Sequence, residues 1–440
     1  MNPRYKHDKP GNIEDYALLG DMRSAALVDR QGSIDWLCVP RFDSPACFAA
    51  LLGRAEHGHW LMRPAADIVS TSRRYRGDTL ILESDLHVSG GAIRIIDFMA
   101  TGTPGLQVVR IVEGLDGEVP LWMQLVVRFD YGSIIPWARR DGNDLYFIAG
   151  PDSLLLRTPV EVSGEGYTSV AEFSVKKGER IPFVLSYYAS HETAGPPLNA
   201  ELLLEETEKG WLEWSAKCTY KGASRDIVQR SLITLKALTY APTGGIVAAP
   251  TTSLPEAIGG IRNWDYRYCW LRDASFTLYA LLMTGYQQEA IAWREWLLRA
   301  IAGRPQDLQI LYGLRGERRL DERELDWLPG YHGSKPVRIG NGAARQFQLD
   351  VYGEVVDMLA LGREVGLEQT DAAIGLKKEI MEFLESGWSR SDSGIWEVRG
   401  PQRHFTHSKN HGMASLRSRP ATRFRCGQDR CANRSLAPNA

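Results

Sequence analysis

Residues 169–217 read SVAEFSVKKGERIPFVLSYYASHETAGPPLNAELLLEETEKGWLEWSAK, and the spacing of apolar residues changes within this stretch. Before residue 190, apolar and polar side chains alternate, which is typical of half-buried strands. Residues 193–199 have the Pro- and Gly-rich composition of a linker. Residues 201–217 then follow the pattern of an amphipathic helix. The stretch therefore predicts a β-rich domain before it and a helical domain after it.

The region before this boundary, from residue 13 to about 190, consists of short segments that alternate or are rich in β-branched residues. ALVDRQGSIDWLCVP predicts a hairpin with its turn at Asp29–Gly32. Gly90–Gly91 and Asp116–Gly117 are expected to form further turns. Many short strands separated by turns favour an antiparallel sandwich.

The region after the boundary has helical periodicity interrupted by long loops. Helices are expected at about residues 273–285, 287–302, 346–365 and 371–388. Between them lie loops at 242–270 and 303–345, and loops of this length inside a compact helical domain are usually functional. The sequence thus predicts an α+β multidomain protein with paired helices that carry elaborate loops.

Composition excludes several classes of protein. The 440 residues are 44% hydrophobic and 24% charged, which suggests two or three domains with large cores. With 52 basic and 54 acidic residues, the net charge of −2 gives no electrostatic reason to expect a nucleic acid or an anionic membrane as partner. No secretory signal and no membrane-spanning run is visible. Six scattered cysteines are too few for a disulfide framework, so we expect free thiols and a cytoplasmic location.

The common cofactor and metal motifs are missing from the sequence. No phosphate-binding loop, dinucleotide fingerprint, HExxH or GxSxG motif is present. His404 and His407 are three residues apart, and Cys426 and Cys431 form a second loose pair. Neither pair has the companion ligands that a metal site needs. We therefore expect neither a metal nor an organic cofactor.

Three loops combine aromatic, arginine and carboxylate side chains, at residues 263–273, 325–341 and 393–400. A sugar needs this combination, because aromatic rings contact its C–H faces while charged groups bind its hydroxyls. In the third loop Glu397 follows Trp396, and partial desolvation beside an indole raises the pKa of a carboxyl group toward that of a general acid. The alternative is structural, with the tryptophan anchoring the loop and Glu397 paired to Arg399.

The sequence resembles glycoside hydrolase family 15, the bacterial glucoamylase and trehalase-like group. The stretches that carry the resemblance are IEDYALLGD (13–21), GSIDWLCVPRFDSP (32–45), NWDYRYCWLRDAS (263–275), ELDWLPGY (324–331), QLDVYGE (348–354), GIWEVRGP (394–401) and HFTHSK (404–409). They are long, occur in the expected order and cover residues 13–409. The resemblance implies a β-sandwich followed by an (α/α)6 barrel. It also implies hydrolysis of α-glucosidic bonds with inversion, without a cofactor.

The resemblance also implies roles for individual residues. Glu397 would be the general acid, and Arg272 and Asp273 would bind the non-reducing glucose. The same pocket would be lined by Trp270, Trp327, Tyr331, Arg338 and Trp396. The substrate would be an α-glucoside, either a maltooligosaccharide or trehalose. The sequence leaves these two open.

The C-terminal part of the chain departs from the family pattern. The general base of this family is a Glu far downstream of the acid, and no Glu follows Glu397 here. Residues 410–419 can be written as codons that encode TMAWRRFDR when the reading frame is shifted by one base. This peptide is close to the family pattern. We therefore expect a chain truncated by a frameshift after about residue 409, which is inactive alone and exposes apolar barrel faces. The expected divisions are a sandwich at 1–192, a linker with a helix at 193–222, a partial barrel at 223–409 and a disordered basic tail at 410–440.

The sequence leaves two other functions open. Disaccharide phosphorylases join a β-sandwich to the same barrel architecture, and phosphate then replaces water as the nucleophile. Alternatively, the chain is a non-catalytic product that at most binds sugar. Phosphate dependence separates the first alternative from hydrolysis, and sugar release that depends on Glu397 excludes the second.

Overall fold

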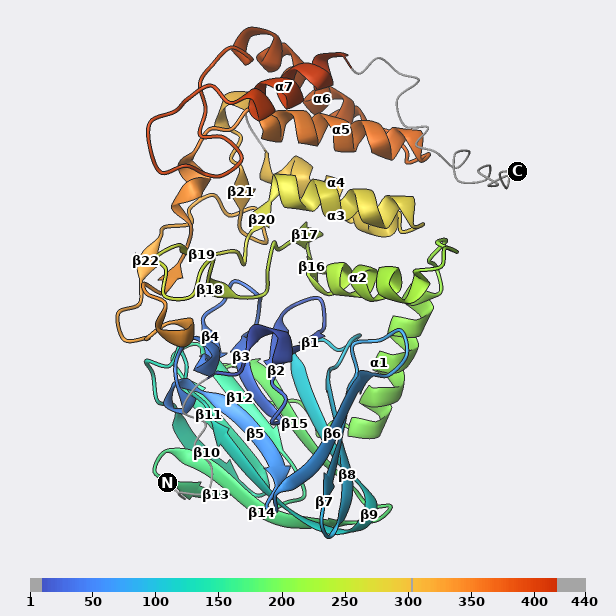
Figure 1. The fold of residues 1–440 in the computed structure, drawn as a ribbon, viewed down its shortest axis with the longest axis vertical. Coiled ribbons are helices and arrows are strands. Elements are labelled where there is room, and N and C mark those ends of the chain that lie inside the picture. Colours follow the sequence, from blue (N-terminus) through green and yellow to red (C-terminus); the bar gives the residue numbers. More distant parts are fainter. Residues whose placement is uncertain (1–9, 302–303, 418–440) are drawn as a thin grey trace, which may run out of the picture.

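The computed structural model describes residues 10–301 and 304–417. Figure 1 shows a β-rich N-terminal part at the bottom and a stack of helices above it. The change from strands to helices falls between β15 (Arg180–Ala189) and α1 (Ala200–Ser215), within the stretch where the sequence pattern changes. The antiparallel β part and the helical part that the sequence predicts are both confirmed.

The strands of the N-terminal part are short, with one exception. In chain order they are β1 Ala17–Gly20, β2 Ala25–Val28, β3 Ser33–Cys38, β4 Ala46–Phe48, β5 His59–Pro64, β6 Ile68–Tyr75, β7 Leu82–Val88, β8 Gly91–Met99, β9 Gln107–Val126, β10 Trp137–Asp141, β11 Asp144–Ala149, β12 Asp152–Arg157, β13 Ser163–Glu165, β14 Thr168–Lys176 and β15 Arg180–Ala189. The hairpin predicted at Asp29–Gly32 is present between β2 and β3, and the turn at Gly90–Gly91 joins β7 to β8.

The exception is β9, a continuous strand of 20 residues that belongs to both halves of the sheet. Its first half pairs with β8 and β15, and its second half pairs with β5 and β14. The turn predicted at Asp116–Gly117 is therefore wrong. Gly117 has φ +65°, and a Cβ there would lie 2.3 Å from the carbonyl oxygen of Gly90. Glycine thus lets the strand change direction beside the turn between β7 and β8 without ending it.

The two halves of the sheet share one apolar core, in which Trp60 and Met62 pack with residues such as Ile95 and Leu154. A fully buried ion pair crosses this core. Arg110 donates to Asp97 at 2.8 Å and to the carbonyl oxygens of Trp60 and Gly32 at 2.7 and 2.8 Å. The guanidinium group of Arg110 therefore links β8, β9 and β5. Its buried charge is compensated by the carboxylate of Asp97.

Helix α1 connects the two parts of the protein. Asn199 caps its N-terminus by accepting hydrogen bonds from the backbone N–H groups of Glu201 and Leu202. Leu203 and Leu204 pack on strands of the β part, and Trp211 and Trp214 pack against α2 and α3. The predicted linker region is thus mainly a helix that contacts both parts.

The remaining helices form two layers. They are α2 Arg225–Ala237, α3 Leu271–Met283, α4 Gln288–Ala300, α5 Asp350–Glu364, α6 Asp371–Gly387 and α7 Thr406–Arg417. Helices α3, α5 and α7 lie side by side, and α4 and α6 pack behind them (Figure 1). In the described part of the chain, every helix is too short or too polar to span a bilayer.

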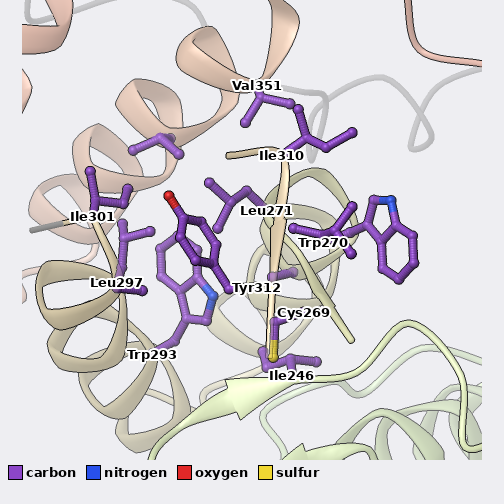
Figure 2. Close-up of a cluster of buried hydrophobic side chains, with 14 of the residues drawn as sticks. Ile246, Cys269, Trp270, Leu271, Trp293, Leu297, Ile301, Ile310, Tyr312 and Val351 are labelled. Atoms are coloured by element: carbon purple, nitrogen blue, oxygen red, sulfur yellow. The ribbon is translucent and has the colours of Figure 1, made fainter. Parts of the chain in front are cut away.

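The long loops contain four short antiparallel strand pairs. They are β16 Thr239–Tyr240 with β17 Gly245–Ile246, β18 Thr252–Pro255 with β19 Asn263–Asp265, β20 Cys269–Trp270 with β21 Leu311–Tyr312, and β22 Arg323–Glu324 with β23 Arg338–Ile339. Figure 2 shows the core beneath them, where Trp293, Leu297 and Tyr312 gather around Leu271. The loops are therefore anchored by packing and by short ladders.

One face of α3 carries large exposed apolar side chains. Phe276 and Met283 are 65% and 56% exposed, and Tyr279 on the same face is 42% exposed. The spacing of these three residues places them on one side of the helix. An exposed apolar face on this helix agrees with the sequence expectation of uncovered barrel surfaces.

Helix α7 corrects the C-terminal boundary that the sequence suggests. The basic tail was expected to begin at residue 410, but the helix continues to Arg417 and packs against α5 and α6. Tertiary contacts with these two helices decide this segment, because its own sequence lacks hydrophobic periodicity. Residues 418–440, with Cys426 and Cys431, lie outside the described residues.

Candidate active site

Arg272 joins the residues predicted to bind and cleave the sugar. It lies in the first turn of α3. Its Nη1 donates to Glu397 Oε1 at 2.7 Å and to the carbonyl oxygen of Ile395 at 3.0 Å. Its Nη2 donates to Asp273 Oδ2 at 3.0 Å. The structure therefore brings Arg272, Asp273 and Glu397 together. In the sequence Glu397 is far from the other two, since Ile395, in the loop that carries Glu397, is 123 residues from Arg272.

The backbone holds Glu397 in an unusual conformation. Its φ is +47°, a left-handed value that costs a residue with a side chain about 1–3 kcal/mol and is often found at functional sites. Gln346 Nε2 donates to the carbonyl oxygen of Glu397 at 3.1 Å, and the Glu397 N–H donates to that of Gly394. A Cβ on Gly394 would lie 2.8 Å from the ring of Phe405. Glycine at 394 and the Gln346 contact together fix the turn that presents the carboxyl group.

Two opposing influences act on the Glu397 carboxyl group. Burial raises its pKa, while the charge of Arg272 and a hydrogen bond from Gln348 lower it, and the net effect is a raised pKa. A raised pKa favours the protonated form that a general acid requires. The alternative pairing of Glu397 with Arg399 is not found, because Glu397 pairs with Arg272.

Arg399 instead anchors the loop that carries Glu397. Its Nη2 donates to Glu322 Oε2 at 2.7 Å. Its guanidinium group lies 4.5 Å from the ring centre of Trp264, and that of Arg338 lies 4.6 Å from the same centre. Trp264 thus interacts with two cations, which lie in separate loops. Through its contact with Trp264, Arg338 therefore helps to hold the loop that carries Glu397.

Tyr266 is a further candidate, which emerges only from the structure. Burial raises the pKa of its hydroxyl group, and the charges of Glu397 and Asp273 raise it further. Its ring lies 5.4 Å from that of Trp270. The tyrosine therefore faces both carboxylates of the site. The sequence signal that could have indicated Tyr266 is its position in NWDYRYCWLRDAS, the stretch that also contains Arg272 and Asp273.

Helix α5 brings buried carboxyl groups close to the site. Asp350 and Glu354 are 0% and 5% exposed, and they lie four residues apart on one face of the helix. Asp392 is also fully buried and accepts a hydrogen bond from the N–H of Leu349. The sequence alone gives none of these residues a role. Their burial could not be inferred from the QLDVYGE motif alone.

The other predicted pocket residues lie in varied surroundings. Trp270 is 2% exposed and belongs to the helical core (Figure 2). Tyr331 is buried, and its hydroxyl group donates to the carbonyl oxygen of Gly11. Trp327 is half-exposed and donates from Nε1 to the carbonyl oxygen of Tyr131. Trp396 is 83% exposed. Tyr331 and Trp327 thus fasten a loop to the β part, and Trp396 is a surface side chain here.

The described residues contain no group of three or more His, Cys, Asp or Glu side chains that could hold a metal ion. His407, one of the two histidines considered in the sequence, lies on α7 with Nδ1 3.6 Å from Asp350 Oδ2. Its surroundings are those of an ion pair between two helices.

Comparison with known families agrees with this arrangement. The profile of glycosyl hydrolases family 15 matches residues 222–424, and that of the trehalase-like N-terminal domain matches residues 6–209. The first match continues beyond residue 409, where the sequence resemblance was expected to end. A trehalase of Thermoplasma acidophilum is 33% identical to the chain, over 89% of the chain and 68% of the relative. The chain belongs to glycosyl hydrolases family 15.

A further curated relative is longer than the chain. A trehalase of Mycolicibacterium smegmatis is 36% identical over 90% of the chain and 64% of that relative. The chain therefore spans just under two thirds of the length of this curated relative. A crystal structure of a bacterial glucoamylase in complex with acarbose has the same fold, with a TM-score of 0.61 at 13% identity, covering 90% of the chain and 62% of the glucoamylase.

Proposed function

We propose that the chain binds trehalose and takes part in hydrolysis of its α-glucosidic bond with inversion, with Glu397 as the general acid. The observation that carries the proposal is the contact of Arg272 with both Glu397 and Asp273. The names of the curated relatives favour trehalose over maltooligosaccharides.

The three residues have separate roles in this mechanism. The Asp273 side chain is 40% exposed, so its carboxylate is open to accept hydrogen bonds from hydroxyl groups of the terminal glucose. The guanidinium of Arg272 orients that carboxylate and donates to a neighbouring hydroxyl. Glu397 transfers its proton to the glycosidic oxygen as the bond to the anomeric carbon breaks.

The contact between Arg272 and Glu397 must change during the reaction. A guanidinium at 2.7 Å stabilises the ionised form of Glu397, which has no proton to give. When sugar hydroxyls take over the Nη1 donor of Arg272, the effect of burial on Glu397 remains and favours the protonated form. Substrate binding thus prepares the acid.

Inversion requires a second carboxyl group roughly 6.5–9.5 Å from the acid, with water between them. In family 15 enzymes this base is expected downstream of the acid, and the sequence contains no Glu after Glu397. We propose that residues 223–409 form part of an (α/α)6 barrel that binds the sugar and carries the acid, Glu397.

Calorimetry with trehalose, maltose and the β-linked cellobiose tests the binding half of the proposal. Trehalose should bind, cellobiose should not, and Arg272→Met should abolish trehalose binding. Arg345→Met is a matched control, because Arg345 is 82% exposed and pairs with Asp321 on the surface. Equal affinity for all three sugars, or unchanged binding by Arg272→Met, would contradict the assignment.

Proton NMR of trehalose incubated with the protein tests the catalytic half. Hydrolysis with inversion should release β-glucose from the attacked ring and an equal amount of α-glucose from the leaving ring, whose C1–O bond stays intact, and both should disappear in Glu397→Gln. Added phosphate should not accelerate release, whereas glucose 1-phosphate as a product would identify a phosphorylase. Glucose release that persists in Glu397→Gln would exclude Glu397 as the acid.

A further inference from the structure

Glu354 is a buried carboxyl group close to the proposed site. The residue lies on α5 and is 5% exposed. Neither of its carboxyl oxygens has a hydrogen-bond partner among residues 10–301 and 304–417. An ionised carboxylate in such a place is strongly destabilising, whereas a protonated one is destabilising to a much smaller extent. The geometry alone therefore favours a proton on Glu354.

The surroundings of Glu354 act in the same direction. From α5 it faces Asp350 and Asp357, and from α3 it faces Arg272 and Asp273. The next groups outward are His407 of α7 beside Asp350 and Lys377 of α6 beside Asp357. Burial raises the pKa of Glu354 to about 8, the charge of Asp350 adds to this effect, and Arg272 opposes it.

Arg272 is the cation that an ionised Glu354 would attract. Helices α3 and α5 pack side by side, and the charges of Arg272 and Glu354 influence each other. The hydrogen bonds of Arg272, however, go to Asp273, Glu397 and Ile395. A negative charge on Glu354 would compete with Glu397 for the same guanidinium.

We propose that Glu354 is a positioning residue that stays protonated beside Arg272 and thereby leaves the charge of Arg272 to Asp273 and Glu397. This inference rests on the proposed function, because it concerns how the same site is held ready for sugar. Ionisation of Glu354 draws Arg272 toward α5, and the site loses the arrangement that binds the terminal glucose.

The first test follows Arg272 without sugar. In protein labelled with ¹⁵N-arginine, the Nε–H signal of Arg272, assigned by its loss in Arg272→Lys, is recorded from about pH 6 to about pH 9. We expect the signal to shift with a midpoint near 8, the value to which burial raises the pKa of Glu354. The shift should vanish in Glu354→Gln, which has the shape of the protonated acid. It should persist in Asp357→Asn, which removes the next carboxylate on the same helix.

The second test measures trehalose affinity over the same pH range. The dissociation constant should be constant at lower pH and rise about tenfold per pH unit above 8, in the wild type and in Asp357→Asn but not in Glu354→Gln. If the Arg272 signal does not titrate, or titrates equally in Glu354→Gln, the inference is overturned. If the signal titrates as expected while trehalose fails to bind at any pH, the proposed function fails and the link between Glu354 and Arg272 stands.

Discussion

Replacing Asp265 by Asn should destabilise the protein by about 3 kcal/mol, because Asp265 compensates a buried cation between the two parts of the chain. Arg267 donates to both carboxylate oxygens of Asp265, at 2.9 and 2.7 Å, and the two side chains are 1% and 0% exposed. The other side of the guanidinium donates to the carbonyl oxygen of Ser44 in the β part at 2.8 Å. The Asp265 carboxylate also accepts from the N–H of Gly340.

The magnitude follows from what asparagine leaves behind. Breaking a buried ion pair by removing one partner typically costs about 3–5 kcal/mol, since the remaining charge has no counter-ion. Asp43 lies close enough to feel the charge of Arg267, so part of the compensation remains and the lower end of the range applies. Asp116→Asn is the control. Asp116 forms a surface pair with Lys177 in which both side chains are 71% exposed, and such pairs contribute about 0–1 kcal/mol.

Urea denaturation followed by tryptophan fluorescence provides the assay, with the free energy of unfolding extrapolated to water. The double variant Asp265→Leu/Arg267→Met should recover most of the loss, because it removes both charges instead of one. A loss below about 1 kcal/mol for Asp265→Asn would refute the reasoning. A double variant as unstable as the sum of the two single variants would refute it as well.

Three further predictions concern the site and its surroundings. The pKa of Glu354 is about 8 in the folded state and 4.5 in the unfolded chain. Between pH 4.5 and pH 8, Glu354 is therefore protonated in the folded protein and ionised in the unfolded chain. The contribution of Glu354 to stability should therefore be fully present below pH 4.5 and fall by about 1.4 kcal/mol per pH unit up to pH 8, so that the fall with pH measured by urea denaturation should be smaller by this slope in Glu354→Gln. Tyr266→Phe should weaken trehalose binding about three- to tenfold in calorimetry, the contribution of one hydrogen bond; unchanged affinity would remove the hydroxyl group from the site. Replacing Phe276, Tyr279 and Met283 by Lys should lower self-association measured by light scattering, since these exposed side chains form an apolar face; undiminished scattering would locate the association elsewhere.

Local patterns in the sequence were sufficient to predict the elements that form mainly through interactions between residues close in the chain. The hairpin at Asp29–Gly32 and the helices α3 to α6 lie within a few residues of their predicted bounds, because alternation and helical spacing record which face each element buries. The same reasoning was wrong at Gly117. A glycine with positive φ serves a turn and a bent strand equally well, and only pairing with both halves of the sheet distinguishes them.

The candidate site divides in a similar way. The motifs identified Arg272, Asp273 and Glu397, but the sequence suggested Arg399 as a possible partner of Glu397 because the two are neighbours in the chain. In the structure Arg399 reaches Glu322, and Arg272 reaches Glu397. Tyr331 and Trp396 have the residue types of a sugar pocket, yet one is buried against the β part and the other is 83% exposed. Residue type does not encode the direction in which a loop side chain points.

The sequence by itself determined the order of a β part and a helical part and the family, and it proposed Glu397, Arg272 and Asp273 as site residues. These depend on local periodicity and on motifs that are contiguous in the chain. The tertiary structure decided which charges meet and which are left without a partner. Glu354 is two helical elements away from Arg272 in the sequence but faces it across packed helices. The protonation of a carboxyl group depends on burial and on neighbouring charges, and these are fixed only when distant segments pack together.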